Sequence, residues 1–277
     1  MTVGVVGLGL IGGSFARAYS GEGHTVLAYD TDKTILDFAI LSGAVSAPLT
    51  DDRLCECDLV LVCTYPQAAC SFLEEKGSLF GKKPVVIDCC GTKLSVVKAG
   101  MASAEKHGFT YAGGHPMAGT QFSGFGHSRM DLFCGAVMVI IPPRTDDIRL
   151  LDKIKALLAP AGFGSITVTT AEVHDRVIAF SSQLAHVVSN AYVKSPTARE
   201  HTGMSAGSYR DLTRVAKLNP EMWTQLFMEN SENLTDEIDC IIKSLTEYRD
   251  AIAAGDRERL KSLLADGSRI KEEVDGK

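Results

Sequence analysis

Near its start the chain carries a glycine-rich turn that joins a short β-branched segment to a helical one. The glycines are spaced G-x-G-x-x-G and are Gly7, Gly9 and Gly12. Residues 2–6 before them favour a strand, and residues 14–19 after them favour a helix. Such a turn lets the backbone approach a pyrophosphate, which then sits at the positive N-terminus of the helix. A purely structural glycine turn is the alternative.

An acidic residue after the second predicted strand favours the cofactor interpretation. Residues 24–29 end at Asp30, 23 residues after Gly7. An acid at this place hydrogen-bonds the adenosine ribose diol and repels a 2′-phosphate, so we predict that the chain binds NAD. The residues expected to contact NAD are Gly7, Gly9, Leu10, Ile11, Gly12 and Asp30, together with Thr64, Tyr65, Pro66 and Gly91 after later strands.

Short apolar segments alternate with helical ones through the first part of the chain, which is typical of parallel βαβ units. Strands are expected over 2–6, 24–29, 58–63, 84–89, 109–112, 136–141 and 165–169. Helices are expected over 12–20, 32–42, 67–75 and 93–107, with another starting near Thr145. The predicted fold class is α/β: a Rossmann-type dinucleotide-binding domain over 1–169, followed by an all-helical substrate-binding and dimerisation domain over 170–277.

The helical part opens with a capping box at 169–172, which predicts a helix to about Lys194. Gln183, His186 and Asn190 share one face of this otherwise apolar helix, so that face lines a polar cleft, finds buried partners or meets solvent. Asn219 and Pro220 predict the start of a second, long helix. Its apolar stripe runs to Ile252 with Asn230 in the one gap, and this stripe is either core or the seam of a homodimer.

Composition restricts the possible partners. The net charge of −6 makes nucleic acid an unexpected partner, and no apolar run reaches the roughly 20 residues that span a bilayer. No signal peptide is evident. The eight cysteines have no C-x-x-C spacing, so we expect reduced thiols, a cytoplasmic location and no metal site.

Three further motifs, combined with the dinucleotide pattern, resemble the prephenate/arogenate dehydrogenase family of tyrosine biosynthesis. They are G-H-P-M-A-G-T at 114–120, H-D-x-x-x-A-x-x-S-x-L-x-H at 174–186 and R-D-x-T-R-x-A at 210–216. The resemblance covers nearly the whole chain. It implies oxidative decarboxylation, in which hydride passes to the nicotinamide, the ring hydroxyl loses its proton and the ring carboxylate leaves as carbon dioxide.

The resemblance also implies catalytic roles for two residues. His115 matches the catalytic histidine of the family, and a neutral imidazole suits deprotonation of a hydroxyl at neutral pH. Thr92 stands where the family usually has Ser, and its hydroxyl is expected to orient the imidazole or to meet the substrate hydroxyl. An alternative for Thr92 is the N-cap of the helix expected over 93–107.

The resemblance implies a substrate site as well. Arg214 matches the substrate-binding arginine, with a salt bridge to Asp211 as the alternative, and His186 matches a substrate histidine. Gln183 replaces a histidine common in the family, and Trp223 lies either at the pocket or in the core. Thr120 and Gln121 complete the predicted substrate contacts, which are Arg214, His186, Gln121, Thr120, Trp223 and Gln183.

Gln121 also bears on the choice of substrate. Many relatives have an acid there, which is able to pair with the ammonium of arogenate, so a neutral amide favours prephenate. Two other functions remain alternatives: a different hydroxyacid or imine reductase, which leaves His115 and Arg214 unexplained, and a catalytically silent module that senses NAD.

Overall fold

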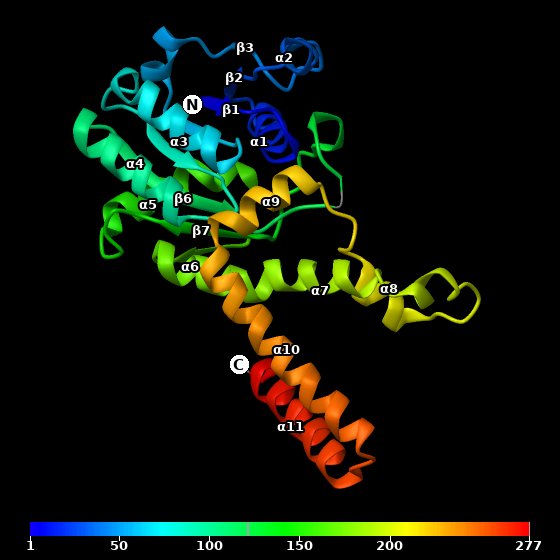
Figure 1. Ribbon diagram of the computed structural model, residues 1–277. Coiled ribbons are helices and arrows are strands. Elements are labelled where there is room, and N and C mark those ends of the chain that lie inside the picture. Colours follow the sequence, from blue (N-terminus) through cyan, green and yellow to red (C-terminus); the bar gives the residue numbers. More distant parts are fainter. Residues whose placement is uncertain (121, 277) are drawn as a thin grey trace. The chain divides into compact units, whose positions relative to one another are not determined.

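The computed structural model describes residues 1–120 and 122–276, and these contain a mostly parallel sheet followed by helices (Figure 1). The strands are β1 Thr2–Val6, β2 Thr25–Tyr29, β3 Ala47–Pro48, β4 Leu59–Val62, β5 Val85–Asp88, β6 Thr110–Pro116, β7 Val137–Ile141 and β8 Ser165–Val168. Their order in the sheet is β3-β2-β1-β4-β5-β6-β7-β8. The seven predicted strands are confirmed, and β3 was not predicted.

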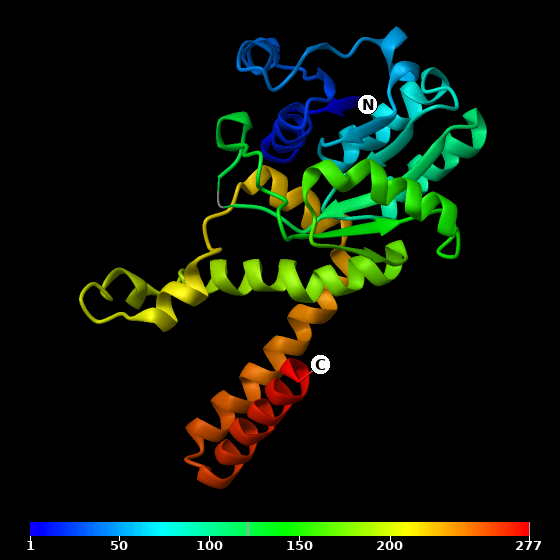
Figure 2. The same ribbon diagram turned by 180° about the vertical axis from the view of Figure 1, so that it is seen from behind.

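Helices follow most of the strands, and the part after β8 is helical (Figures 1 and 2). They are α1 Leu10–Gly21, α2 Lys33–Leu41, α3 Pro66–Lys76, α4 Leu94–His107, α5 Ile148–Leu158, α6 Ala171–Ile178, α7 Ala185–Tyr192, α8 Gly207–Thr213, α9 Pro220–Glu229, α10 Ser231–Ala253 and α11 Arg257–Asp275. The α/β class with a helical C-terminal part is therefore confirmed.

Strand side chains alternate between two apolar layers, which explains why both faces of the sheet carry helices. Val3 and Val5 of β1 pack with the side chains of α1, whereas Val60 and Val62 of β4 pack with those of α3. Successive residues of a strand point to opposite faces, so one buried apolar run supplies both layers. The order of the strands reverses between β1 and β4, where sheets of this kind bind ligands beyond the carboxyl ends.

One pairing differs from the expected parallel arrangement, because β7 runs antiparallel to β6. Parallel neighbours need a long crossover, usually a helix. The segment 117–136 between these strands contains only the short 3-10 turn η3 Phe125–His127 among its described residues, so the chain turns back instead of crossing over. The antiparallel pairing places the end of β6, which carries His115, beside the start of β7.

Two predicted helix boundaries are wrong. The cap of α5 is Asp147, whose carboxylate accepts from the backbone N–H of Leu150, and not Thr145. The long helix expected after Asn219 is two helices, because the buried Asn230 interrupts it between α9 and α10. By contrast, Asn219 caps α9 as predicted, and α6 begins at the predicted capping box, although its cap is Thr170, one residue after Thr169.

The chain forms two compact units, residues 1–230 and 231–277. The second unit is a helical hairpin of α10 and α11. Its turn contains Gly255 at φ +67°, and Asp256 caps α11 by accepting from the N–H of Arg259. The hydroxyl of Tyr248 donates to the carbonyl of Leu263 at 3.1 Å and joins the two helices. No helix in the described part of the chain is both long and apolar enough to cross a bilayer.

Candidate active site

The glycine turn after β1 has room for a ligand where a nucleotide would lie. Gly7 has φ +88°, and a Cβ there would lie 2.9 Å from the carbonyl oxygen of Cys63. A Cβ at Gly12 would lie 1.9 Å from the oxygen of Gly7, whereas one at Gly9 would meet nothing within 4 Å. The turn therefore packs tightly against backbone atoms at Gly7 and Gly12, whereas the space beside Gly9, at the N-terminus of α1, is open. This geometry fits a pyrophosphate on the free backbone N–H groups.

Asp30 lies at the end of β2 and holds the same turn. One carboxylate oxygen accepts from the N–H of Leu8 at 2.6 Å, and the other accepts from Asp32 at 2.9 Å. The carboxylate therefore contributes to the shape of the glycine turn in addition to its expected role toward a ribose. This structural role was not predicted from the sequence.

Two buried hydroxyls follow the next two strands of the sheet. Thr64 comes after β4 and Thr92 after β5, and the Oγ1 atoms of both are buried without a hydrogen-bond partner among the described residues. Buried polar atoms are nearly always paired, so a bound ligand or water would complete both hydroxyls. Gly91, next to Thr92, is partly exposed. Tyr65 and Pro66 form the N-terminus of α3, so the remaining residues predicted to contact NAD follow β4 and β5 at the same edge of the sheet.

Thr92 does not cap α4. That helix begins at Leu94, and its N-terminal N–H groups are bound by a carboxylate from α6. Asp175 accepts from the N–H of Lys93 at 2.8 Å and from that of Leu94 at 2.9 Å. The capping alternative for Thr92 is therefore wrong, and its hydroxyl stays available.

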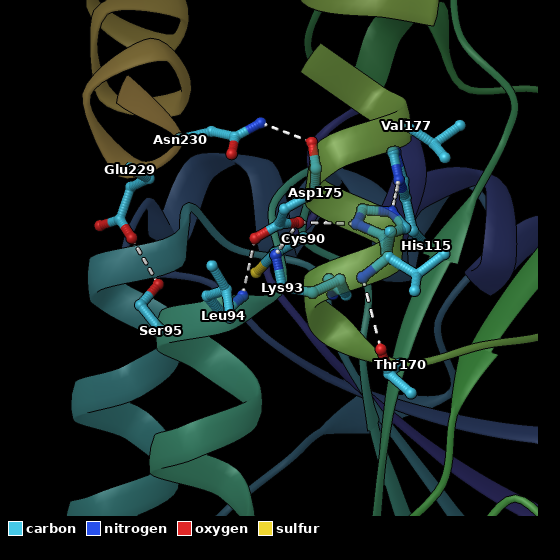
Figure 3. Close-up of polar contacts among 12 residues, drawn as sticks. Cys90, Lys93, Leu94, Ser95, His115, Thr170, Asp175, Val177, Glu229 and Asn230 are labelled. Carbon is cyan, nitrogen blue, oxygen red and sulfur yellow. Dashed lines mark hydrogen bonds and ion pairs between the residues drawn. The ribbon is translucent and has the colours of Figure 1, made fainter. Parts of the chain in front are cut away.

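His115 lies near the end of β6 with its two ring nitrogens in different surroundings (Figure 3). Nδ1 lies 2.9 Å from Nε2 of His174 on α6. Nε2 faces Gly91, where a Cβ would lie 4.0 Å from it. Burial, helped by the neighbouring His174 and Lys93, holds the pKa of His115 well below its usual value. The imidazole is therefore kept neutral, as a base must be.

A buried ion pair supports the strand that carries His115. Lys93 and Asp88 are paired with neither side chain exposed, and the ammonium of Lys93 also donates to the carbonyl of Gly114. The other donors to Asp88 are Tyr111 Oη at 2.7 Å, Cys90 N at 3.0 Å and Gly114 N at 3.3 Å. The pair thus joins the ends of β5 and β6. The sequence predicted ligand contacts for Gly91 and Thr92 at this strand end, but it did not predict this ion pair.

The polar face of the helix after β8 is satisfied by main-chain carbonyls. Gln183, His186 and Asn190 each bond to one such carbonyl, so the solvent alternative is wrong. The acceptors are Leu226, Val215 and Ala216, at 3.0, 3.1 and 3.0 Å respectively. Gln183 lies in a π-helical turn, Ala179–Leu184, and its oxygen also accepts from Asn230. Both ends of its amide are occupied, and its contact with substrate stays a prediction.

His186, Trp223 and Arg214 gather at one end of α9. The His186 and Trp223 rings lie 3.9 Å apart, and both are partly exposed. Burial lowers the pKa of His186, and the charge of Arg214 adds to this effect. Arg214 is exposed, while Asp211 lies beside Arg210 at 3.9 Å, so the predicted alternative of an Arg214–Asp211 bridge is not found in the described part of the chain.

Helix α9 connects these groups to His115. Leu226, one turn after Trp223, would lie 3.3 Å from a Cβ at Gly91, which faces His115. A groove of about 800 Å³ adjoins the same helix, between α9 and α3, and Tyr65 is among the residues that line it. Thr120 is exposed, and its Oγ1 accepts from Phe122 N at 3.2 Å. Gln121 lies outside the described residues.

Two family models match the chain. The nucleotide-binding domain of prephenate dehydrogenase matches residues 15–167, and the dimerization domain of prephenate dehydrogenase matches residues 170–266. The cyclohexadienyl dehydrogenase of Zymomonas mobilis is 30% identical over an alignment of 269 positions, which covers 93% of this chain and 90% of that protein. The prephenate dehydrogenase of Bacillus subtilis is 28% identical over 274 residues, 94% of this chain and 72% of that protein.

Solved structures are similar over the full length. Prephenate dehydrogenase from A. aeolicus, in complex with hydroxyphenyl propionate and NAD⁺, matches with a TM-score of 0.82 at 26% identity, covering 99% of this chain and 98% of that one. The arogenate dehydrogenase of Synechocystis matches with a TM-score of 0.81 at 24% identity, covering 99% and 100%, and shows the same fold.

Proposed function

The chain belongs to the prephenate dehydrogenase family, and we propose that it catalyses the NAD-dependent oxidative decarboxylation of prephenate in tyrosine biosynthesis. The observation that carries this proposal is His115, a desolvated histidine that burial keeps neutral. Its Nε2 faces Gly91, which follows β5 at the edge of the sheet where the cofactor is expected. A base beside a nicotinamide is what oxidation of a hydroxyl-bearing carbon requires.

The reaction divides between the cofactor and the residues of this chain. NAD, when bound, accepts the hydride from C4 of the substrate ring. His115 Nε2 takes the proton of the C4 hydroxyl, and the electrons of the departing ring carboxylate complete the aromatic ring. The buried hydroxyl of Thr92 has no hydrogen-bond partner among the residues that the structure describes, and the proposal places it against the same substrate hydroxyl. The closed glycine turn and Asp30 hold the nucleotide.

The charged ends of prephenate need a cation, and the proposal assigns Arg214 to this role. Its guanidinium is exposed and has no ion-pair partner in the described part of the chain. A planar fork of donors suits a carboxylate. His186 and Trp223 form the adjoining wall, with Gln183, Thr120 and Gln121 as the further predicted contacts.

Replacing Arg214 by Ala is expected to raise KM for prephenate about 10- to 150-fold, because a hydrogen bond to a charged group contributes about 1.5–3 kcal/mol. The change in kcat should be smaller, since the guanidinium binds the substrate without taking part in the chemistry. Steady-state kinetics measure both constants. Arg210→Ala is the matched control, because in the described part of the chain the one ion-pair partner of that exposed side chain is the neighbouring Asp211. An equal KM in the two variants would remove Arg214 from the pocket.

The neutral side chain at 121 supports prephenate over arogenate, because it lacks the charge that an acid offers to the ammonium of arogenate. The experiment compares the two substrates with NAD by absorbance at 340 nm. We expect a higher kcat/KM for prephenate. A higher value for arogenate would reverse the substrate assignment, and no reaction with either would overturn the function and favour a module that only binds NAD.

Asp30→Asn should raise the ratio of kcat/KM for NADP to that for NAD roughly 10- to 100-fold, because it removes a like charge near the 2′-phosphate. An amide oxygen can still accept from the N–H of Leu8, so the contact to the glycine turn is kept, while the second contact, from the N–H of Asp32, is lost. Asp30→Ala removes both functions and should weaken the binding of both cofactors. If wild-type protein used NADP as well as NAD, the assignment of Asp30 would fail.

We also propose that the protein is a homodimer, supported by the match to a dimerization domain over residues 170–266. The exposed apolar side chains of α10 and α11 are consistent with this, among them Leu245, Ile252 and Leu264. A cytoplasmic location is supported by the eight cysteines, which are all free. Light scattering of the purified protein tests the oligomeric state.

A further inference from the structure

A chain of three buried or partly buried side chains leads from the proposed reaction site into the protein (Figure 3). His115 Nδ1 lies 2.9 Å from His174 Nε2, and His174 Nδ1 lies 2.7 Å from Asp175 Oδ1. The side chains of His174 and Asp175 are 2% and 0% exposed, so water does not supply alternative partners. Both ring nitrogens of His174 are used within this chain.

The donors around Asp175 determine where the protons lie. Its two oxygens face the backbone N–H groups of Lys93 and Leu94 at the N-terminus of α4, a place that favours a carboxylate. A carboxylate only accepts, so Nδ1 of His174 carries a proton. In neutral His174, Nε2 is then an acceptor, so Nδ1 of His115 is the donor. The Nε2 of His115 is thereby left bare and faces Gly91.

We propose that His174 and Asp175 are positioning residues that hold His115 in the tautomer able to accept a proton at Nε2. This proposal rests on the proposed function, in which His115 is the base. When Nε2 takes the substrate proton, the new positive charge is stabilised by the hydrogen bond from Nδ1 to His174 and, through it, by Asp175. The remaining charged group facing His115 is Lys93, which is neutralised by Asp88.

A role confined to structure would leave part of this arrangement unexplained. Capping α4 requires the carboxylate of Asp175 but not the ring of His174. In the described part of the chain, the ring of His174 hydrogen-bonds to Asp175 on one side and to His115 on the other. The ring therefore links the fixed carboxylate to the base, as an orienting group does in other acid–base sites.

¹⁵N NMR of the histidine-labelled protein, recorded without substrate, tests the proposed tautomer of His115 directly. The resonances of His115 are identified by their absence from His115→Gln. We expect Nδ1 protonated and Nε2 bare in the wild-type protein, and a mixture of tautomers in His174→Phe, which removes the acceptor. Protonated Nε2 in the neutral wild-type ring would overturn the proposal. This result needs no substrate, so it stands apart from the test of turnover with prephenate.

Kinetics supply the second readout. In Asp175→Asn an amide offers one oxygen and one donating nitrogen, so it cannot accept at both positions, and the tautomer of His174 is no longer defined. We expect kcat for prephenate to fall about 10²-fold or more with KM within about threefold, since a general base typically contributes 10²–10⁴. The control is Asp147→Asn, which alters the carboxylate cap of α5 and does not belong to the His115–His174–Asp175 series.

The two variants separate positioning from stability. Asparagine caps a helix about as well as aspartate, so the exposed-cap variant Asp147→Asn should leave the thermal midpoint nearly unchanged, whereas Asp175→Asn should lower it because the buried carboxylate accepts at both oxygens. Only Asp175→Asn should change kcat and the ¹⁵N spectrum of His115. Equal kcat values in Asp175→Asn and Asp147→Asn, with an unchanged spectrum, would reduce Asp175 to a helix cap and overturn the proposal.

Discussion

His115→Asn is expected to lower kcat for prephenate about 10²- to 10⁴-fold, the usual contribution of a general base. The dissociation constant of NAD should stay within about twofold, because the ring contacts the substrate hydroxyl and not the nucleotide turn. Asparagine fills a similar volume but cannot take up a proton. Stopped-flow absorbance at 340 nm measures the rate, and fluorescence titration measures cofactor binding. Turnover that survives the substitution would show that another group is the base.

The pH dependence of the wild-type enzyme gives a second readout for the same residue. Burial lowers the pKa of His115, so the neutral form persists at pH values where an ordinary histidine, with a pKa of about 6.5, is protonated. The acid limb of kcat/KM should therefore lie below pH 6.5. A limb above pH 6.5 would contradict the desolvated environment of the ring.

Lys93→Met is expected to lower the free energy of unfolding by about 3–5 kcal/mol, because it leaves the carboxylate of Asp88 buried without its cation. The methionine side chain fills most of the space of the lysine stem, so the loss comes mainly from the charge. Urea denaturation followed by circular dichroism measures the difference. Adding Asp88→Asn to the variant should recover part of the loss, because no charge is then left buried.

An exposed ion pair provides the matched control for this prediction. Lys83 lies 3.1 Å from Asp58, and the two side chains are 53% and 33% exposed. Lys83→Met should cost less than about 1 kcal/mol, since solvent screens such pairs. Similar losses in the two variants would mean that the Lys93–Asp88 pair is hydrated in solution.

Several parts of the site were readable from local sequence. The G-x-G-x-x-G turn, Asp30 after β2 and the helix start at the capping box of 169–172 depend on residues close together in the chain, and their conformational requirements are local. The motif around His115 and the R-D-x-T-R-x-A segment carried the resemblance to a family that the comparisons then supported. The reversed direction of β7 also has a local cause, because no crossover helix lies between β6 and β7 in the described residues. The alternation of strands and helices nevertheless led to the prediction of a parallel strand here.

The amino-acid order alone determined which segments become strands and helices, the glycine turn and the candidate chemical groups, because these follow from spacing and backbone preference. Only the tertiary structure decided which groups meet. Asp175 caps a helix that begins 81 residues earlier, and His174 reaches the ring of His115, 59 residues away. Hydrogen bonds across such separations depend on how α6 packs against the start of α4 and the end of β6, and no local pattern encodes that packing.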